Sequence, residues 1–218
     1  MRKQTFALFD ADGTLLDSMP YHRALAAECM VEYFEETGID YKKALAEYDR
    51  TIGVPFLMQM EAIFPEATAI QRILCTEAYN RRKREEVYGK AKSFSDVNGG
   101  VLEIIGAGIV PSVSTSNERD AVAGALEREG ILGYFEAVRG LEDGSKSEHI
   151  EIVRKRYNPE EIFFIGDTPH DMSMSEFGVI TIGRNGDRDG EYSREALMDA
   201  GASFVTNNFK DLLTLMSK

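Results

Sequence analysis

The chain has 218 residues, of which 43% are hydrophobic, with a formal net charge of -12 at pH 7 and a pI of about 4.8. This length allows one large domain or one domain with an insert. The acidic balance argues against a nucleic-acid-binding protein, which would carry a basic face. The first apolar stretch ends at Asp10, too soon for a signal peptide, and no stretch approaches membrane-spanning length. We therefore expect a cytoplasmic protein with no membrane or nucleic-acid partner.

The first strong pattern is an apolar run, residues 6–9, that stops at Asp10, with a second carboxylate at Asp12 and a glycine at position 13. Four consecutive apolar residues are typical of a strand buried on both faces, as in parallel sheets. Asp10 would then lie at the carboxyl end of that strand, where open α/β sheets bind their ligands. Because two close carboxylates repel, such a pair usually needs a cation, a shared proton or a basic partner.

Further strand patterns alternate with helical ones. This alternation predicts the α/β class, with a doubly wound parallel sheet covered by helices on both faces. The expected strands are residues 5–9, 109–114, 136–138, 162–165, 179–182 and 203–205, and the expected helices include 118–129, 147–157 and 209–216.

One interval, from about residue 20 to about residue 93, contains helical patterns and no strand pattern. Residues 21–36 form an amphipathic stripe, Asp40 and Thr68 can each cap a helix, and Pro55 suits a first helical turn. We expect a core domain of residues 1–18 and 94–218 and an inserted all-helical cap of residues 19–93, which can act as a lid. The fourth cap helix is expected to be amphipathic and to bear Ile70, Ile73, Leu74 and Ala78 as its apolar residues. The two cysteines, Cys29 and Cys75, fit no metal spacing and are expected to be buried free thiols.

Polar residues follow several of the predicted strands. Asp10 and Ser114 end two of them, Asp167 and Asp171 follow a third, and Lys146 precedes a helix. In a parallel sheet these residues would meet at one edge. Each has an ordinary alternative: Ser114 could cap a helix, Lys146 could be a solvated lysine, and the two aspartates could be first-turn helix acids.

Together, these residue types suit phosphoryl chemistry. Carboxylates of Asp10 and Asp167, with Asp171 as a further candidate, offer the hard oxygen ligands that Mg²⁺ prefers. Lys146 and Ser114 offer a cation and a hydroxyl to phosphoryl oxygens. Asp10 could then attack phosphorus, and Asp12 could protonate the leaving oxygen and later deprotonate water.

At these residues the chain resembles the haloacid dehalogenase superfamily, in its phosphatase branch with a helical cap. Asp10-Ala11-Asp12-Gly13-Thr14 is similar to the first motif of that family, Ser114 to the second, Lys146 to the third and residues 166–171 to the fourth. The resemblance implies that Asp10 is the nucleophile and Asp12 the general acid/base. It also implies that Asp10, the backbone carbonyl of Asp12, Asp167 and Asp171 hold Mg²⁺. The chain departs from the family pattern at Ser147, because many relatives have a proline directly after the lysine of the third motif.

The resulting hypothesis is a Mg²⁺-dependent phosphatase acting on a small phosphorylated metabolite, such as phosphoglycolate or a sugar phosphate. A β-phosphoglucomutase-like phosphomutase is the nearest alternative, favoured by His22 and weakened by Phe56. A receiver-like phospho-signalling module is more remote, because it leaves no room for a helical insert. Candidate substrate residues in the insert, each with a structural alternative, are His22, Arg50, Arg81 and Lys83.

Overall fold

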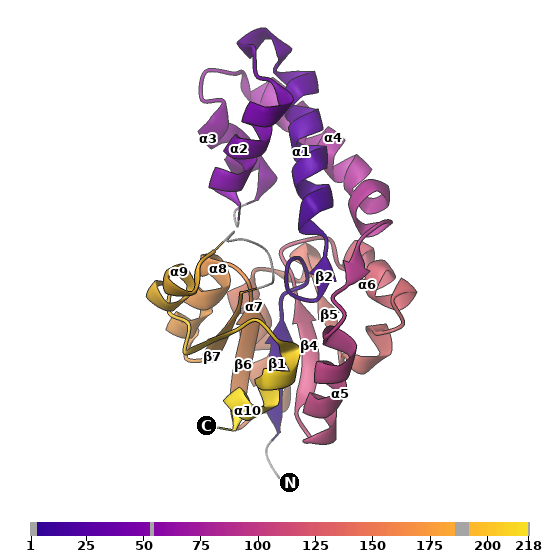
Figure 1. Ribbon diagram of the computed structural model, residues 1–218, viewed down its shortest axis with the longest axis vertical. Coiled ribbons are helices and arrows are strands. Elements are labelled where there is room, and N and C mark those ends of the chain that lie inside the picture. Colours follow the sequence, from indigo (N-terminus) through magenta and orange to yellow (C-terminus); the bar gives the residue numbers. More distant parts are fainter. Residues whose placement is uncertain (1–3, 53–54, 186–191, 218) are drawn as a thin grey trace. The chain divides into compact units, whose positions relative to one another are not determined.

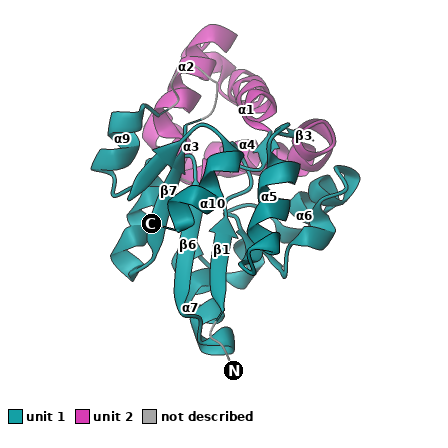
Figure 2. Cartoon of the chain, turned by 60° about the horizontal axis from the view of Figure 1, so that its bottom comes forward, with its two compact units in different colours: residues 1–17, 92–218 teal, residues 18–91 magenta. Residues whose placement is uncertain are grey.

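The computed structural model describes residues 4–52, 55–185 and 192–217 (Figure 1). The chain divides into two compact units, coloured separately in Figure 2: residues 1–17 with 92–218, and residues 18–91. Each unit has its own cluster of buried apolar side chains.

In the larger unit, six of the described segments form a parallel sheet in the order β5-β4-β1-β6-β7-β8. Strand β1 lies between β4 and β6, so its backbone is hydrogen-bonded on both sides. This topology confirms the predicted α/β class with a parallel sheet. The strands are β1 Thr5–Phe9, β4 Val110–Ser114, β5 Val138–Arg139, β6 Glu161–Gly166, β7 Ile180–Arg184 and β8 Phe204–Thr206.

Side chains of β1 alternate between the two faces of the sheet, as expected for a period of two residues. Phe6 and Leu8 pack in one cluster with Ile150 and Val153 of α7. Phe9 instead stacks on the ring of Phe209, with a centroid distance of 5.8 Å. Helices of the larger unit are α5 Val97–Gly106, α6 Arg119–Arg128, α7 Lys146–Tyr157, α8 Pro169–Met172, α9 Arg194–Asp199 and α10 Leu212–Met216.

Most predicted elements of this unit are offset from the structure by one or two residues at an end, and two of these differences have a clear structural origin. The edge strand β5 occupies Val138–Arg139 instead of residues 136–138, because it pairs only with the end of β4, at Val113 and Ser114. The helix expected at residues 209–216 begins with the 3₁₀ turn Phe209–Asp211 before α10. A small antiparallel pair, β2 Leu16–Asp17 and β3 Lys92–Ser93, completes the unit.

The smaller unit is helical in its described residues: α1 Met19–Tyr33, α2 Tyr41–Thr51, α3 Phe56–Ile63 and α4 Ala69–Lys83, followed by the π-helical turn Arg84–Tyr88. Asp40 caps α2 by accepting a hydrogen bond from the Lys43 N–H at 2.8 Å. Thr68 and Gln71 form a capping box at the start of α4. Both cysteines are buried and free, as expected. Within the described residues, we find no helix with the length and apolar character that a membrane crossing requires.

The buried face of α4 differs from the one that its apolar pattern indicates. Ile70, Ile73 and Leu74 are 69%, 45% and 45% exposed, whereas Cys75, Ala78 and Tyr79 are buried. Three of the four apolar residues expected on this helix therefore lie outside its buried face. The four expected residues and the buried residues each form a stripe with helical spacing, and Ala78 belongs to both stripes. Periodicity alone therefore does not show which stripe is buried. Packing against α1 and α3, which the sequence pattern does not encode, selects the stripe of Cys75 and Tyr79.

Helix α7 is joined to the sheet by a fully buried imidazole. His149 Nε2 lies 3.1 Å from the carbonyl oxygen of Gly140, and Nδ1 lies 2.9 Å from Ser114 Oγ. A carbonyl only accepts, so Nε2 donates. Burial lowers the pKa of His149, with Arg139 and Lys146 acting in the same direction, so the ring is neutral and Nδ1 accepts from the Ser114 hydroxyl.

The position of the α4 face can be tested by a pair of substitutions. Ile70→Gln should change the free energy of unfolding by less than about 0.5 kcal/mol, since Ile70 is largely exposed. Ala78→Gln forces a long polar side chain into the helical core and should cost about 2 kcal/mol or more. Urea unfolding followed by circular dichroism measures both. A larger cost at position 70 than at position 78 would contradict this assignment of the buried face.

Replacement of His149 by phenylalanine tests the buried hydrogen bonds. His149→Phe keeps a ring but leaves Ser114 and Gly140 without this partner, so it should cost about 1–3 kcal/mol near neutral pH. The folded state binds the His149 proton less well than the unfolded state does, so stability from this group is lost as pH falls below the usual pKa of 6.5. The difference in unfolding free energy between wild type and variant should therefore shrink in acid. A difference that grows on acidification would show that His149 is protonated in the folded protein.

Candidate active site

The register of the sheet brings the ends of three strands to the same level. Phe9 of β1 pairs with Val113 of β4 on one side and with Ile165 of β6 on the other. The N–H of Asp10 continues the pattern by donating to the Ile165 carbonyl at 2.8 Å. Asp10 and Ser114 come directly after the paired residues Phe9 and Val113, so both lie at the same edge of the parallel sheet.

The loop after β1 is tightly closed and leaves no room for a side chain at Gly13. The N–H groups of Leu15 and Leu16 both donate to the carbonyl of Ala11, and Gly13 has a φ of 74°. A Cβ atom at Gly13 would lie 2.1 Å from Asp167 Oδ2. Glycine is needed here for both its left-handed conformation and its small size. The loop can therefore approach Asp167 closely.

Two further contacts fix this loop. Thr14 Oγ1 donates to Asp167 Oδ1 at 3.0 Å, and Arg184 donates to the Thr14 carbonyl at 2.6 Å. Arg184 is itself buried, paired with Asp96 at 2.9 Å, and lies over the ring of Phe94 at 4.1 Å. Arg184 is not predictable from the sequence, because a lone arginine at a strand end carries no motif.

A buried lysine connects the groups at the sheet edge. Lys146, the first residue of α7, places Nζ 2.8 Å from Asp10 Oδ1 and 2.6 Å from Asp171 Oδ1. Its side chain is 5% exposed, and those of the two aspartates are 9% and 0% exposed. Lys146 is therefore not the solvated lysine that the sequence also allowed. Removing one partner of such a buried ion pair costs about 3–5 kcal/mol, because the other charge stays buried.

Asp171 is held on both of its oxygens. While Oδ1 accepts from Lys146, Oδ2 accepts from the hydroxyl of Thr168 at 2.6 Å and from its N–H at 3.1 Å. Asp171 thus completes the capping box of α8. It is therefore also the first-turn helix acid that the sequence allowed as an alternative. Close packing explains Gly166, where a Cβ would lie 2.3 Å from the Asp171 Cγ.

The titration behaviour of the cluster reflects burial among like charges. Burial raises the pKa of Asp10 to about 7; Lys146 opposes this rise, while Asp171 and Asp12 add to it. Burial also raises the pKa of Asp167 well above its usual value, and Asp171 and Asp10 contribute. Burial alone would lower the pKa of Lys146, but the two aspartates in contact with it raise its pKa instead. The single positive charge of Lys146 does not neutralise the negative charges of the nearby carboxylates, so binding of a further cation is favoured at this edge of the sheet.

The donor set fits a hard divalent cation. Asp10, Asp167 and Asp171 each offer a carboxylate oxygen, and these oxygens lie within 4.8 Å of one another. All-oxygen ligands suit Mg²⁺, and the set contains no thiolate or imidazole of the kind that zinc prefers. Since Lys146 and Thr168 already use both oxygens of Asp171, Asp10 and Asp167 are the better candidates for direct ligands.

Asp12 and Ser114, the other two candidates in the larger unit, have hydrogen-bond partners that the sequence pattern does not predict. Asp12 Oδ2 accepts a hydrogen bond of 2.7 Å from the side-chain amide of Asn117. Ser114 directs its hydroxyl hydrogen toward His149, so donation from Ser114 to a phosphoryl oxygen requires that bond to break. Neither Asn117 nor His149 stands out in sequence, because both act through contacts between distant segments.

The substrate candidates of the helical unit have different surroundings within that unit. His22 is buried, with Nδ1 2.6 Å from the hydroxyl of Tyr79, and the Phe56 ring stacks on Tyr79 at 4.0 Å. Lys83 is also buried, with Nζ 5.6 Å from the centre of the Tyr79 ring. Arg50 and Arg81 are exposed, and Arg50 pairs with Glu47 at 2.7 Å. His22 and Lys83 thus share one aromatic neighbour, Tyr79.

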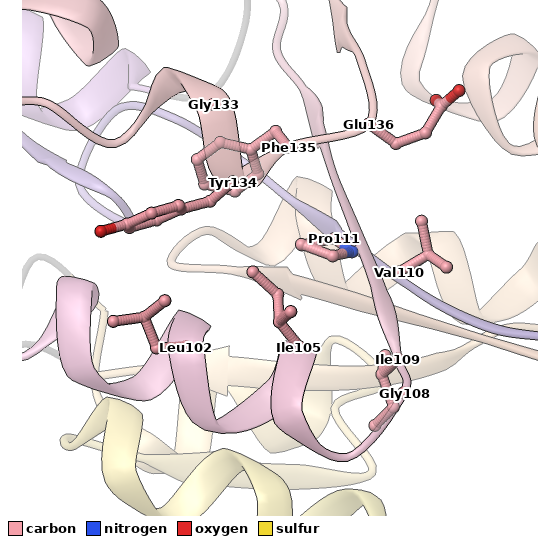
Figure 3. A pocket seen from close by; sticks show the side chains of 10 residues that line it. All are labelled: Leu102, Ile105, Gly108, Ile109, Val110, Pro111, Gly133, Tyr134, Phe135 and Glu136. Atoms are coloured by element: carbon pink, nitrogen blue, oxygen red, sulfur yellow. The ribbon is translucent and has the colours of Figure 1, made fainter.

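A groove elsewhere in the larger unit lacks this chemistry. It has a volume of about 550 Å³ and lies between α5 and the start of β4, where Leu102, Ile105 and Tyr134 line it (Figure 3). Among its described lining residues, the only carboxylate is that of Glu136. Ser114 lies three positions beyond Pro111, the last residue of β4 that lines the groove, which is roughly 10 Å along the strand. The groove is therefore separate from the acid and lysine cluster.

Comparison with known proteins agrees with the geometry. Residues 7–182 match the family of haloacid dehalogenase-like hydrolases. The pyrophosphatase PpaX of Bacillus velezensis is 25% identical over 194 residues, covering 84% of this chain and 83% of the relative. A relative in Caldanaerobacter subterraneus subsp. tengcongensis that carries the same PpaX name is 27% identical over 187 residues, covering 83% of this chain and 81% of the relative.

Solved structures share the fold at low sequence identity. The structure of a predicted phosphatase from Clostridium acetobutylicum superposes with a TM-score of 0.80 at 20% identity, covering 100% of this chain and 99% of the other. The family match spans the strands and loops that carry Asp10, Asp12, Ser114, Lys146 and Asp171. The chain belongs to the haloacid dehalogenase-like hydrolase family.

Proposed function

We propose that the protein is a Mg²⁺-dependent phosphatase that hydrolyses a small phosphorylated metabolite through an aspartyl-phosphate on Asp10. The observation that carries the proposal is the position of Lys146, buried between Asp10 and Asp171, with Asp167 close enough to complete a set of cation ligands. A phosphoryl dianion needs cationic groups around it before a carboxylate can approach phosphorus. The cluster offers both the cation and the carboxylate.

The residues divide the reaction into two steps. In the first, an oxygen of Asp10 bonds to phosphorus while the bond to the leaving oxygen breaks, and that oxygen takes a proton from Asp12. In the second, Asp12 accepts a proton from water as the water oxygen attacks phosphorus. The bond to Asp10 then breaks and inorganic phosphate leaves.

The remaining groups support these two steps. Asp10 and Asp167, with the backbone carbonyl of Asp12, would hold Mg²⁺, which when bound supplies positive charge to the phosphoryl oxygens. Lys146 supplies a second positive charge and also fixes the direction of the Asp10 carboxylate. Asp171 holds Lys146 in place. Since bulk water would compete with Asp10 for the phosphoryl group in the first step, we propose that the helical unit acts as a cap that limits the access of water.

Two substrate classes deserve comparison. A phosphomonoester such as phosphoglycolate or a sugar phosphate fits the proposed use of Asp12 as a general acid, because an alkoxide is a poor leaving group. Pyrophosphate is a second candidate, favoured by the PpaX name that both curated relatives carry. Its leaving group is a phosphate, which depends less on protonation. Family membership disfavours the receiver-like alternative, and the phosphomutase alternative receives no support from Phe56, which stacks on Tyr79.

Removal of the proposed nucleophile tests the mechanism. Asp10→Asn should lower kcat by at least about a thousandfold with p-nitrophenyl phosphate, because no acyl phosphate can form. Circular dichroism should show an unchanged secondary structure. As a matched control, Asp120→Asn alters an exposed aspartate on α6 and should leave kcat within about twofold of wild type. An Asp10→Asn protein that retains wild-type turnover would refute the assignment of the nucleophile.

Metal removal and a substrate panel test the cofactor and the substrate class. Chelation by EDTA should abolish phosphate release, and excess Mg²⁺ should restore it; release that persists in EDTA would contradict metal dependence.

In the same assay, phosphoglycolate, glucose 6-phosphate and pyrophosphate can be compared by kcat/KM. We expect a phosphomonoester to be preferred. A pyrophosphate value more than about tenfold above the others would favour the second candidate.

A further inference from the structure

We propose that Asn117 is a positioning residue for the general acid/base, directing the carboxyl group of Asp12 toward the leaving oxygen. This inference rests on the phosphatase function proposed above. It starts from a single contact between two loops, the 2.7 Å hydrogen bond from Asn117 Nδ2 to Asp12 Oδ2. A carboxylate only accepts, so the amide nitrogen must be the donor.

The two loops leave neighbouring strands at the same level. Asp10 follows β1 and Ser114 ends β4, where Phe9 and Val113 are paired. Asp12 lies two residues beyond Asp10, and Asn117 lies three residues beyond Ser114. The contact therefore joins the loop of the proposed nucleophile to the loop of the proposed phosphate-binding serine.

The backbone around Asn117 is held independently of its side chain. The N–H of Asn117 donates to Thr115 Oγ1 at 3.1 Å, and its carbonyl accepts from the N–H of Leu141 at 2.9 Å. Thr115 is in turn buried, and its N–H donates to the Arg139 carbonyl at 3.0 Å. The amide of Asn117 therefore projects from a fixed support, as a positioning group must.

The backbone that carries Asp12 is also fixed, but from the opposite side. Thr14, two residues later, accepts a hydrogen bond from Arg184 through its carbonyl and donates from its hydroxyl to Asp167. These contacts locate the loop without reaching the Asp12 carboxyl group. Asn117 adds a hydrogen bond to that carboxyl group itself.

This arrangement predicts a selective defect. A general acid matters most when the leaving oxygen would otherwise depart as a strongly basic alkoxide, and little when the leaving group is p-nitrophenolate. A misdirected Asp12 should therefore slow phosphoryl transfer from an alkyl phosphate more than transfer from p-nitrophenyl phosphate. A residue with only a structural role would slow both reactions alike.

The experiment compares kcat/KM for glycerol 2-phosphate and for p-nitrophenyl phosphate, since this ratio reports the first chemical step in both cases. Asn117→Ala removes the amide and keeps both backbone hydrogen bonds. It should lower kcat/KM for glycerol 2-phosphate about tenfold and leave that for p-nitrophenyl phosphate within about twofold of wild type. The control Asp120→Asn, an exposed change on the following helix, should alter neither value.

A double-mutant cycle shows whether Asn117 acts through Asp12. In an Asp12→Ala background, Asn117→Ala should cause no further loss with glycerol 2-phosphate, because the group that it positions is absent. Equal losses with both substrates in the single variant, no loss with either, or a further full loss in the double variant would each overturn the inference alone. A wild-type protein inactive on both substrates would overturn the proposed function, and this inference with it.

Discussion

Lys146 is the constraint on which the rest of the site depends. Its ammonium is buried between Asp10 and Asp171, and a buried charge is tolerated only where partners of opposite sign are in contact with it. This requirement fixes three segments relative to one another: the end of β1, the start of α7 and the first turn of α8. The cost of burying the lysine is offset by these contacts, so the two aspartates serve the stability of the fold as well as its proposed chemistry.

The same cluster explains the glycines nearby. Gly13 and Gly166 lie where a Cβ would reach the carboxyl groups of Asp167 and Asp171, at 2.1 Å and 2.3 Å from the nearest atoms. Carboxylates that must converge on one point leave no room for side chains on the loops between them. Crowding also keeps water out, which raises the pKa of Asp10 and Asp167 and makes an additional cation favourable. Packing and electrostatics are therefore two consequences of one geometry.

The sequence predicted those features that depend on local pattern. The strand Thr5–Phe9 and the caps at Asp40 and Thr68 follow from hydrophobic runs and from side chains that can bond their own backbone. The gathering of Asp10, Lys146 and Asp171 was also predictable, because parallel strands bring their carboxyl ends together. The buried face of α4 was not, since Ile70 and Cys75 lie on equally plausible stripes and only the neighbouring helices decide. Asn117, His149 and Arg184 were missed for a related reason: each acts through a contact to a segment distant in sequence, and no local pattern marks such contacts.

Arg184, His149 and Asn117 all support residues of the motifs through single contacts. Groups proposed to touch the phosphoryl centre come from motifs, whereas the groups that hold them come from single residues on adjoining segments. Arg184 holds the Thr14 carbonyl, His149 holds Ser114, and Asn117 holds Asp12. A motif can supply the right chemical groups only if its loops are kept in register, because small displacements weaken both proton transfer and charge stabilisation. Loss of one such supporting contact should therefore lower the rate even while every motif residue is present.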